Sequence, residues 1–293
     1  MLVNLNDVMK FANENEVAIG AFNVPNFESA QAIVEAAEEK NMPVILNYAG
    51  VHEPLMKIEE AALIMLHFAK KSTVPICVHL DHGSSFEACI KAIRLGFTSV
   101  MIDASASSFE DNVKETQAVV RAAHSVGVSV EAELGHIFAS EIGLGEGGVS
   151  ESAKNYADLN DIYTSPKLAK EFVERTGVDA LAIAFGTSHG LYKEKPVLDL
   201  DRIKLIKEAI DIPFVMHGGS GLSKEEFQTA IKNGIRKINY YTYMTLYGGK
   251  AVYNHLSSMS KDDNIFFHDI PVIAKNAMKE DVKRAIGVFS FNE

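Results

Sequence analysis

The sequence has little cysteine, because its 293 residues include only Cys77 and Cys89. The two residues fall in different predicted elements, and they match neither a disulfide framework nor a cysteine-based zinc site. We therefore expect two buried thiols rather than a cross-linked or cysteine-metal scaffold.

The sequence also lacks an excess of positive charge and any long apolar run. It has 28 lysine and arginine residues against 39 aspartate and glutamate residues, a formal net charge of -11. Binding to a nucleic-acid backbone needs clustered basic residues, so we expect no nucleic-acid partner. No stretch approaches the ~18 apolar residues of a membrane span, and the N-terminus does not resemble a signal peptide. These absences predict no membrane partner and a cytoplasmic location. A small phosphorylated metabolite stays compatible with the charge, because a few backbone amides bind it locally.

What the chain does contain is a regular alternation of short apolar runs and amphipathic helical patterns. The runs are nearly continuous in hydrophobicity, as expected for parallel strands that are covered on both faces. Eight runs predict strands at 17–23, 43–48, 75–81, 99–105, 127–134, 179–186, 213–218 and 235–241. Helices are predicted between them at 27–40, 56–71, 85–96, 108–127, 165–177, 201–210 and 223–234.

Local signals support the helix ends. Ser223 with Glu226 fits a capping box, and Ser108 with Asp111 fits one more weakly. Four glycines stand where helices should end: Gly96, Gly127, Gly177 and Gly234. Eight strand-helix units without a linker favour an α/β fold, a (β/α)8 TIM barrel, over a doubly wound sheet. We expect one barrel domain over residues 1–293.

Two segments depart from the alternation. Residues 136–164 are too long for an ordinary strand-helix connection and are rich in glycine, serine and acids, so we expect a mobile loop over the active face. Extra C-terminal helices are predicted at 243–258 and 270–287, outside the barrel or against a partner subunit.

Three histidines follow apolar runs: His82, His189 and His217. In a parallel barrel the turns after the strands converge on one face, so the three imidazoles could meet at one ion. Three neutral imidazoles bind zinc and leave a fourth position for substrate. A single histidine at a strand end is more often a hydrogen-bonded structural residue, but three such residues favour a metal site.

A glycine-rich segment follows His217. The sequence Gly218-Gly219-Ser220 precedes the helix that starts near Ser223, and it is typical of a backbone nest that binds phosphate. Ser220 could add a hydroxyl group, and Lys193 could add a positive charge. The glycines could also do no more than end a strand.

The order of these motifs resembles the class II, metal-dependent ketose-bisphosphate aldolases, in particular the fructose- and tagatose-bisphosphate branch. The resemblance runs from Asn23 to Thr242. Its motifs are HLDHGSS (79–85), MIDAS (101–105), VEAELG (130–135), GTSHGLYK (186–193), HGGSG (217–221) and KIN (237–239) followed by Thr242.

The resemblance implies a set of site residues. His82, His189 and His217 would be the zinc ligands, and Asp81 would move the proton of the substrate C4 hydroxyl. Asp103 and Glu133 would steady the ligands or hold the metal in an alternate position. Glu141 would exchange a proton on the dihydroxyacetone phosphate carbon, with Glu146 as a competing candidate. Substrate and phosphate contacts would come from Asn23, Gly190, Lys193, Gly218, Gly219, Ser220, Asn239 and Thr242.

The resemblance also implies cofactors and assembly. One Zn2+ per subunit is expected, with Co2+ or Mn2+ in its place as a second possibility and a monovalent cation as a further candidate. A homodimer or homotetramer is expected, because the family shares an active-site residue between subunits.

The chain departs from the family pattern in two places. After Asn239 it has Tyr240-Tyr241-Thr242-Tyr243, where relatives have a small or aliphatic pair, then Thr, then an acid. His268 aligns with an arginine that holds the far phosphate in relatives, and histidine lacks the fixed bidentate charge of arginine.

The leading hypothesis is an aldolase that reversibly cleaves a ketose 1,6-bisphosphate into dihydroxyacetone phosphate and an aldehyde such as glyceraldehyde 3-phosphate, in carbohydrate metabolism such as glycolysis. Fructose and tagatose bisphosphates stay open, as does a non-phosphorylated acceptor aldehyde. Two competing hypotheses are a Schiff-base aldolase that uses Lys237 and a non-catalytic barrel that binds a sugar phosphate.

Overall fold

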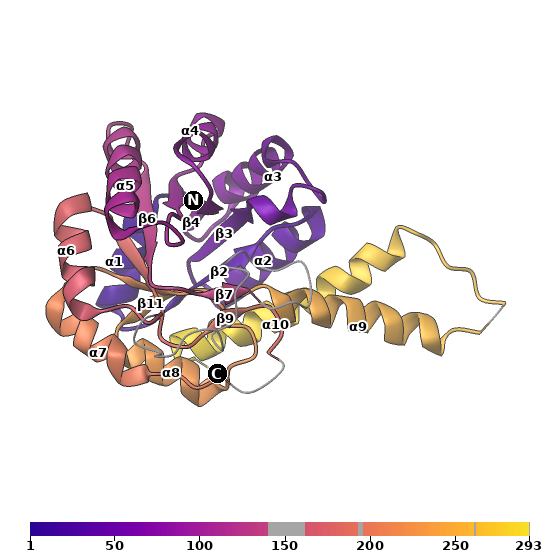
Figure 1. Ribbon diagram of the computed structural model, residues 1–293. Coiled ribbons are helices and arrows are strands. Elements are labelled where there is room, and N and C mark those ends of the chain that lie inside the picture. The colour runs from indigo at the N-terminus through magenta and orange to yellow at the C-terminus, as the bar shows by residue number, and fades with distance from the viewer. Residues whose placement is uncertain (140–161, 193–195, 261, 293) are drawn as a thin grey trace.

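The computed structural model describes residues 1–139, 162–192, 196–260 and 262–292. Eight parallel strands form a closed barrel, because β4 pairs with both β3 and β5 and β11 pairs with both β10 and β2 (Figure 1). The predicted TIM barrel is confirmed, and each of the eight apolar runs overlaps one barrel strand. The barrel strands are β2 (Ile19–Asn23), β3 (Val44–Ala49), β4 (Ile76–Gly83), β5 (Ser99–Ile102), β6 (Ser129–Leu134), β8 (Ala180–Ile183), β10 (Phe214–Met216) and β11 (Ile235–Asn239).

Seven helices between the strands cover the outside of the barrel, at the places where helical patterns predict them. They are α2 (Phe27–Lys40), α3 (Ile58–Lys71), α4 (Phe86–Leu95), α5 (Phe109–His124), α6 (Pro166–Thr176), α7 (Leu200–Ala209) and α8 (Lys224–Asn233). Their apolar faces and the outward-facing strand residues make one continuous core.

The predicted capping signals are mostly correct. The Ser223 hydroxyl accepts a hydrogen bond from the Glu226 amide, and the Glu226 carboxylate accepts one from the Ser223 amide. Gly96, Gly177 and Gly234 are C-caps as predicted. Gly127 is not, because α5 already ends at His124 and Gly127 lies in the turn that leads into β6, with φ +75°.

The sixth strand is shorter than its apolar run, and this corrects the expected position of His189. β8 ends at Ile183, and His189 lies in a separate short strand, β9 (Ser188–His189), which pairs with β7 (Phe138–Ala139). The chain turns at Gly186 with φ +112°, where a side chain would collide with the Val197 carbonyl oxygen. The turn therefore interrupts the apolar run before it reaches the histidine.

The N-terminal segment forms two elements that the strand pattern does not predict. β1 (Leu2–Val3) pairs with β4, and α1 (Leu5–Glu14) packs against the inward-facing residues at the amino end of the barrel. A local signal for α1 was present, because Asn4 and Asp7 form a capping box. The helix closes that end of the barrel with apolar side chains.

Inward-facing positions change from apolar to polar along the strands. Because strand side chains alternate, residues two apart point into the same layer of the barrel interior. Near α1 the interior holds Ile19, Ile45, Cys77 and Val215. Toward the carboxyl ends, the same faces carry Asn23, Asn47, His79, Asp81, Glu131, Glu133, Lys237 and Asn239, all buried. The fold thus concentrates polar groups at one end.

Both predicted C-terminal helices are present, as α9 (Thr242–Ser258) and α10 (Asp269–Ser290). They form an arm that extends away from the barrel, and α10 returns along α2 (Figure 1). Among the described residues, no helix is long and apolar enough to cross a membrane.

The two cysteines behave as predicted. Cys77 and Cys89 are free and buried, and burial raises the pKa of both thiols to about 12.

Candidate active site

The three predicted ligand histidines meet at the carboxyl end of the barrel. His82 comes from β4, His189 from β9, and His217 directly follows β10. Their ring centroids lie 4.7 to 5.5 Å apart, and each ring offers a nitrogen within 4.8 Å of the others. The fold therefore brings His82 together with two histidines that lie more than one hundred positions later in the sequence.

The backbone at His82 aims this side chain at the cluster. His82 has φ +48°, a left-handed conformation that is uncommon for a residue with a side chain. The register between β4 and β5 shifts between Leu80 and Gly83, so the irregularity falls at this residue. Such local strain is typical of functional sites, where surrounding structure holds it in place.

Carboxylates determine which ring nitrogens face the cluster. The His82 Nδ1 lies 2.7 Å from Asp103 Oδ2, and the His217 Nε2 lies 2.9 Å from Glu131 Oε1. An ionised carboxylate only accepts hydrogen bonds, so both of these nitrogens carry protons and donate. The remaining nitrogens, His82 Nε2 and His217 Nδ1, face each other at a hydrogen-bond distance of 2.9 Å.

Without a metal ion, His82 Nε2 carries a proton and donates it to His217 Nδ1, because two facing lone pairs would repel at this distance. A divalent ion would replace this proton. Burial lowers the pKa of His82, but the Asp81 and Asp103 carboxylates outweigh burial and raise it to about 10. Burial and His82 hold the pKa of His217 well below its usual value, so the His217 ring is neutral. Carboxylate-oriented imidazoles of this kind are the usual environment of protein-bound zinc, so the three histidines fit a divalent ion.

Asp81 lies beside the ligand cluster and is completely buried in β4. The Asn239 amide donates to both of its carboxylate oxygens, at 3.0 and 3.2 Å. Burial raises the pKa of Asp81, although His82 and Lys237 oppose the rise. A carboxyl group with a raised pKa in this position suits proton transfer. The sequence analysis expected Asn239 to contact the phosphate. In the structure its side chain instead donates hydrogen bonds to Asp81, the predicted acid/base.

The other two predicted carboxylates also lie next to the histidines. Asp103 accepts hydrogen bonds from His82 and from the amide and hydroxyl of Ser105, and these outweigh burial and lower its pKa. Glu133 is buried, with Oε2 3.9 Å from His217 Nδ1, and burial followed by Asp103 raises its pKa well above the usual value. His82, Asp103 and Glu133 together form a second possible ligand group.

The glycine-rich segment after His217 is tightly packed. Gly218 has φ +67°, and a Cβ there would lie 2.4 Å from the Ser188 carbonyl oxygen, so only glycine fits. The Tyr192 hydroxyl donates to the Gly218 carbonyl at 2.6 Å. Gly190, at the end of β9, also has positive φ. The segment is therefore held in one conformation.

The predicted phosphate residues after β11 lie beside this segment. Ser220 Oγ accepts a hydrogen bond from the Tyr241 amide, and a Cβ at Gly219 would lie 3.1 Å from the Asn239 carbonyl oxygen. Thr242 begins α9, so its backbone amide lies at a helix N-terminus, where anions bind favourably. The structure brings these residues together, and their phosphate contacts stay a prediction.

The sequence analysis did not assign four buried residues of the interior layer to the metal site, and it considered Lys237 only as a Schiff-base lysine. These residues are His79, Glu131, Lys237 and Asn47. The first three lie two positions before Asp81, Glu133 and Asn239, so strand alternation could have identified them. Asn47 pairs in register with Asn23, and neither amide group has a hydrogen-bond partner among the described residues. Only the pairing of β2 with β3 brings these two amides side by side.

Some predicted residues do not appear at the cluster. Glu141, Glu146 and Lys193 lie outside the described residues, as does most of the loop predicted at 136–164. His268 precedes the first residue of α10, and its side chain is 80% exposed. The segment before α10 lies at the far end of the arm from the barrel (Figure 1). The expected role of His268 at the far phosphate stays a prediction.

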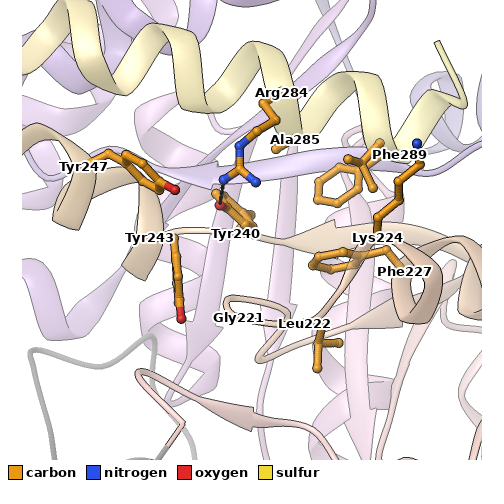
Figure 2. Close-up of a pocket in the computed structure, with 11 residues that line it drawn as sticks. Gly221, Leu222, Lys224, Phe227, Tyr240, Tyr243, Tyr247, Arg284, Ala285 and Phe289 are labelled. Atoms are coloured by element: carbon orange, nitrogen blue, oxygen red, sulfur yellow. Dashed lines mark hydrogen bonds between the residues drawn. The ribbon is translucent and has the colours of Figure 1, made fainter. Parts of the chain in front are cut away.

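A cavity of about 200 Å³ lies outside the barrel, between α8, α9 and α10. Figure 2 shows Lys224, Tyr243, Tyr247 and Arg284 around it, with Arg284 donating to the Tyr240 hydroxyl at 3.4 Å. Gly221 lines the cavity and follows the glycine-rich segment. None of the three histidines lines it, so this cavity is separate from the metal cluster.

Lys237, the candidate for a Schiff base, is completely buried, and its Nζ lies 2.8 Å from Glu131 Oε2. A Schiff-base lysine must reach the substrate carbonyl as a neutral amine. The ion pair to Glu131 does not favour Schiff-base chemistry.

The fold and the cluster define a class of protein: a (β/α)8 barrel with three histidines at the carboxyl end of its strands that could hold a metal ion. The family model of class II fructose-bisphosphate aldolase matches residues 3–293. The chain belongs to this family, whose members are lyases that break a carbon-carbon bond and whose chemistry implies a divalent metal.

Individual relatives agree with this assignment. The chain is 40% identical to a fructose-bisphosphate aldolase of Staphylococcus aureus, over 98% of this chain and 97% of the relative. It is 42% identical to a probable fructose-bisphosphate aldolase of Bacillus subtilis, over 96% of this chain and 95% of the relative. The crystal structure of the YdjI aldolase from Escherichia coli superposes with a TM-score of 0.84 at 34% identity, covering 99% of this chain and 97% of that one.

Proposed function

We propose that this chain is a metal-dependent aldolase that reversibly cleaves a ketose 1,6-bisphosphate to dihydroxyacetone phosphate and an aldehyde such as glyceraldehyde 3-phosphate. The observation that carries the proposal is the convergence of His82, His189 and His217, whose ring nitrogens lie within 4.8 Å of one another beside the buried Asp81. Family membership supports the same activity.

A divalent ion held by the three histidines would polarise the C2 carbonyl and stabilise the negative charge that develops when the C3–C4 bond breaks. Asp81 takes the proton of the C4 hydroxyl, so C4 leaves as an aldehyde while the bond electrons stay on C3. Asn239 holds the Asp81 carboxylate in position for this transfer. Glu141, or Glu146 in its place, then delivers a proton to C3.

The cradle of Gly218, Gly219 and Ser220, with the amide of Thr242, would hold the phosphate of the dihydroxyacetone half. Gly190 and Lys193 would add to it. Asn23 faces the barrel interior with an amide that has no hydrogen-bond partner among the described residues, which suits a substrate hydroxyl. Buried, unpaired amides of this kind are costly unless a ligand satisfies them.

The finer assignments belong to the same proposal. Zinc is the expected ion over cobalt or manganese, because an all-imidazole site with an open position is typical of zinc. The homo-oligomeric state, the cytoplasmic location and the single-domain organisation stay predictions.

The test is an aldol assay with the purified full-length chain. Dihydroxyacetone phosphate is offered with glyceraldehyde 3-phosphate or with unphosphorylated aldehydes, and cleavage of fructose and tagatose bisphosphates is followed in parallel. We expect phosphorylated acceptors to be used, and we expect a chelator to abolish turnover and added zinc to restore it.

Asp81→Asn supplies the second arm of this test. It removes the proton acceptor but keeps the size of the side chain, so kcat should fall by about 10²–10⁴-fold while metal content stays unchanged. Full activity of a rigorously metal-free protein would contradict the proposal. Binding of the sugar phosphate without turnover would instead support the non-catalytic barrel.

A further inference from the structure

Beneath the metal cluster, a chain of buried contacts crosses the barrel interior. Glu131 of β6 accepts a hydrogen bond from His217 through Oε1, at 2.9 Å. Its other oxygen, Oε2, lies 2.8 Å from Lys237 Nζ of β11 and 3.6 Å from His79 Nε2 of β4. Glu131, Lys237 and His79 are all completely buried. Side chains from β4, β11 and the residue after β10 therefore surround the carboxylate of Glu131.

This arrangement is costly for the fold. A buried ion pair contributes little net stability, because desolvation of both charges offsets their attraction, and apolar residues of similar volume are often as stable. Folding alone thus gives no reason for Lys237 to lie in the barrel interior, where it could be an apolar residue. Its position suggests a role that depends on the charge of Glu131.

We infer that Glu131 and Lys237 are positioning residues for the metal centre, which together hold His217 in the tautomer that directs its Nδ1 lone pair at the ion. Glu131 only accepts hydrogen bonds, so the proton of neutral His217 must lie on Nε2. Lys237 binds Oε2 and thereby leaves Oε1 facing His217. This inference rests on the proposed metal-dependent function.

The same contacts assign Lys237 a role other than that of a nucleophile. His79, Asp81 and Glu131 form a group whose atoms lie close enough to hold a metal ion. The Lys237 ammonium group already lies 2.8 Å from one of these carboxylate oxygens. It therefore supplies the positive charge that a metal ion would otherwise supply to these three side chains. A second divalent ion there would face a like charge at close range.

The experiment measures zinc affinity directly, by competition with a chromophoric chelator at neutral pH. In Glu131→Gln the carboxamide can donate to His217 Nε2, which moves the ring proton to Nδ1 and blocks the ligand. Outer-sphere partners of metal ligands typically change affinity by about 10–100-fold, and we expect a loss in this range for Glu131→Gln and for Lys237→Met. In both variants, the absorption bands of the cobalt-substituted protein should differ from those of the cobalt-substituted wild-type chain.

Ser99→Ala is the matched control. Ser99 is buried in the adjacent strand β5, and its hydroxyl lies 2.8 Å from His79 Nδ1 at the far side of the same layer. It has no contact with His217, so its loss should leave zinc affinity unchanged. Equal losses in Ser99→Ala and Glu131→Gln would contradict a specific positioning role.

The double variant Glu131→Gln with Lys237→Met separates positioning from folding. It removes both buried charges, so the thermal unfolding temperature measured in excess chelator should recover toward that of the wild-type chain. Zinc affinity should stay low, because nothing then directs the His217 tautomer. Zinc binding by the double variant as tight as that of the wild-type chain would overturn the inference. If the wild-type chain itself bound no zinc, the proposed function would fail instead.

Discussion

Two regions of this protein use the same residue types for different ends. In the barrel interior, Lys237 lies 2.8 Å from Glu131, and both are completely buried. On the outer surface, where α10 packs on α2, Lys279 and Lys283 lie 2.9 and 2.8 Å from Glu39, whose side chain is 44% exposed. The distances are equal, so the solvent around each pair and not its geometry determines what the pair does.

In the interior, a charge cannot exchange its partner for water, so each ionic contact constrains its neighbours. Glu131 is tied to Lys237 and His217, and Asp81 is tied to Asn239. At the surface, water and salt replace a lost partner with little change in free energy. Interior pairs can therefore position catalytic groups, whereas surface pairs mainly contribute solubility and a small part of helix packing.

The largest expected effect comes from removing a ligand in the interior. His217→Ala removes a metal ligand and the hydrogen bond that Glu131 accepts, and loss of metal chemistry worth several kcal/mol corresponds to a fall in kcat/KM of at least about 10³-fold. Activity and metal content by elemental analysis measure this. His255→Ala, an exposed histidine on α9 of the arm, is the control and should leave both unchanged. If His217→Ala kept the zinc content and activity of the wild-type chain, His217 would not be a metal ligand, and the interior cluster would not be the active site.

A smaller effect is expected when only the counter-charge is removed. Lys237→Met leaves Glu131 as an uncompensated buried charge, a change that typically costs about 3–5 kcal/mol of unfolding free energy. Lys279→Met at the surface should change it far less, because Glu39 keeps Lys283 and solvent. Urea denaturation of both variants in excess chelator compares the two directly. Similar losses would show that burial does not distinguish the two pairs.

The smallest effect concerns the pH dependence of the surface pair. Hydrogen bonds from Lys279 and Lys283 lower the pKa of Glu39 from 4.5 to about 2. A depressed carboxyl pKa adds stability that is present above the unfolded value and is lost as pH falls from about 4.5 toward 2. The stability difference between wild type and Glu39→Gln should therefore be small at neutral pH and shrink across this window. Urea midpoints measured at several pH values test this, and a difference that grows on acidification would contradict the assignment.

Much of the fold could be predicted because it depends on short-range patterns. Six of the eight barrel strands lie inside their predicted apolar runs, and β3 and β4 extend one and two residues beyond theirs. Helix α2 has the predicted bounds of residues 27–40. Where prediction failed, a backbone feature interrupted the pattern: the turn at Gly186 ends β8 early and places His189 in β9. The N-terminal helix α1 was missed although its capping box at Asn4 was readable.

The candidate site was predicted unevenly. His82, Asp81 and His217 stand at strand ends within distinctive motifs, so their convergence could be expected. Glu131 lies between Val130 and Ala132, and Lys237 lies between Arg236 and Ile238, so neither local sequence indicates which residue the charge pairs with. His217 and Glu131 are 86 positions apart, and Asn239 and Asp81 are 158 apart. No local pattern encodes such pairs.

The sequence by itself determined the eight strand-helix units, the three histidines at one end of a barrel, and the family resemblance, because periodicity and motif spacing act over a few residues. Tertiary structure alone decided that the barrel closes, that Asn239 holds Asp81, and that Glu131 and Lys237 lie beneath His217. The physical reason is register: a one-residue shift of any strand would turn these side chains out of the interior, and only the paired strands specify it.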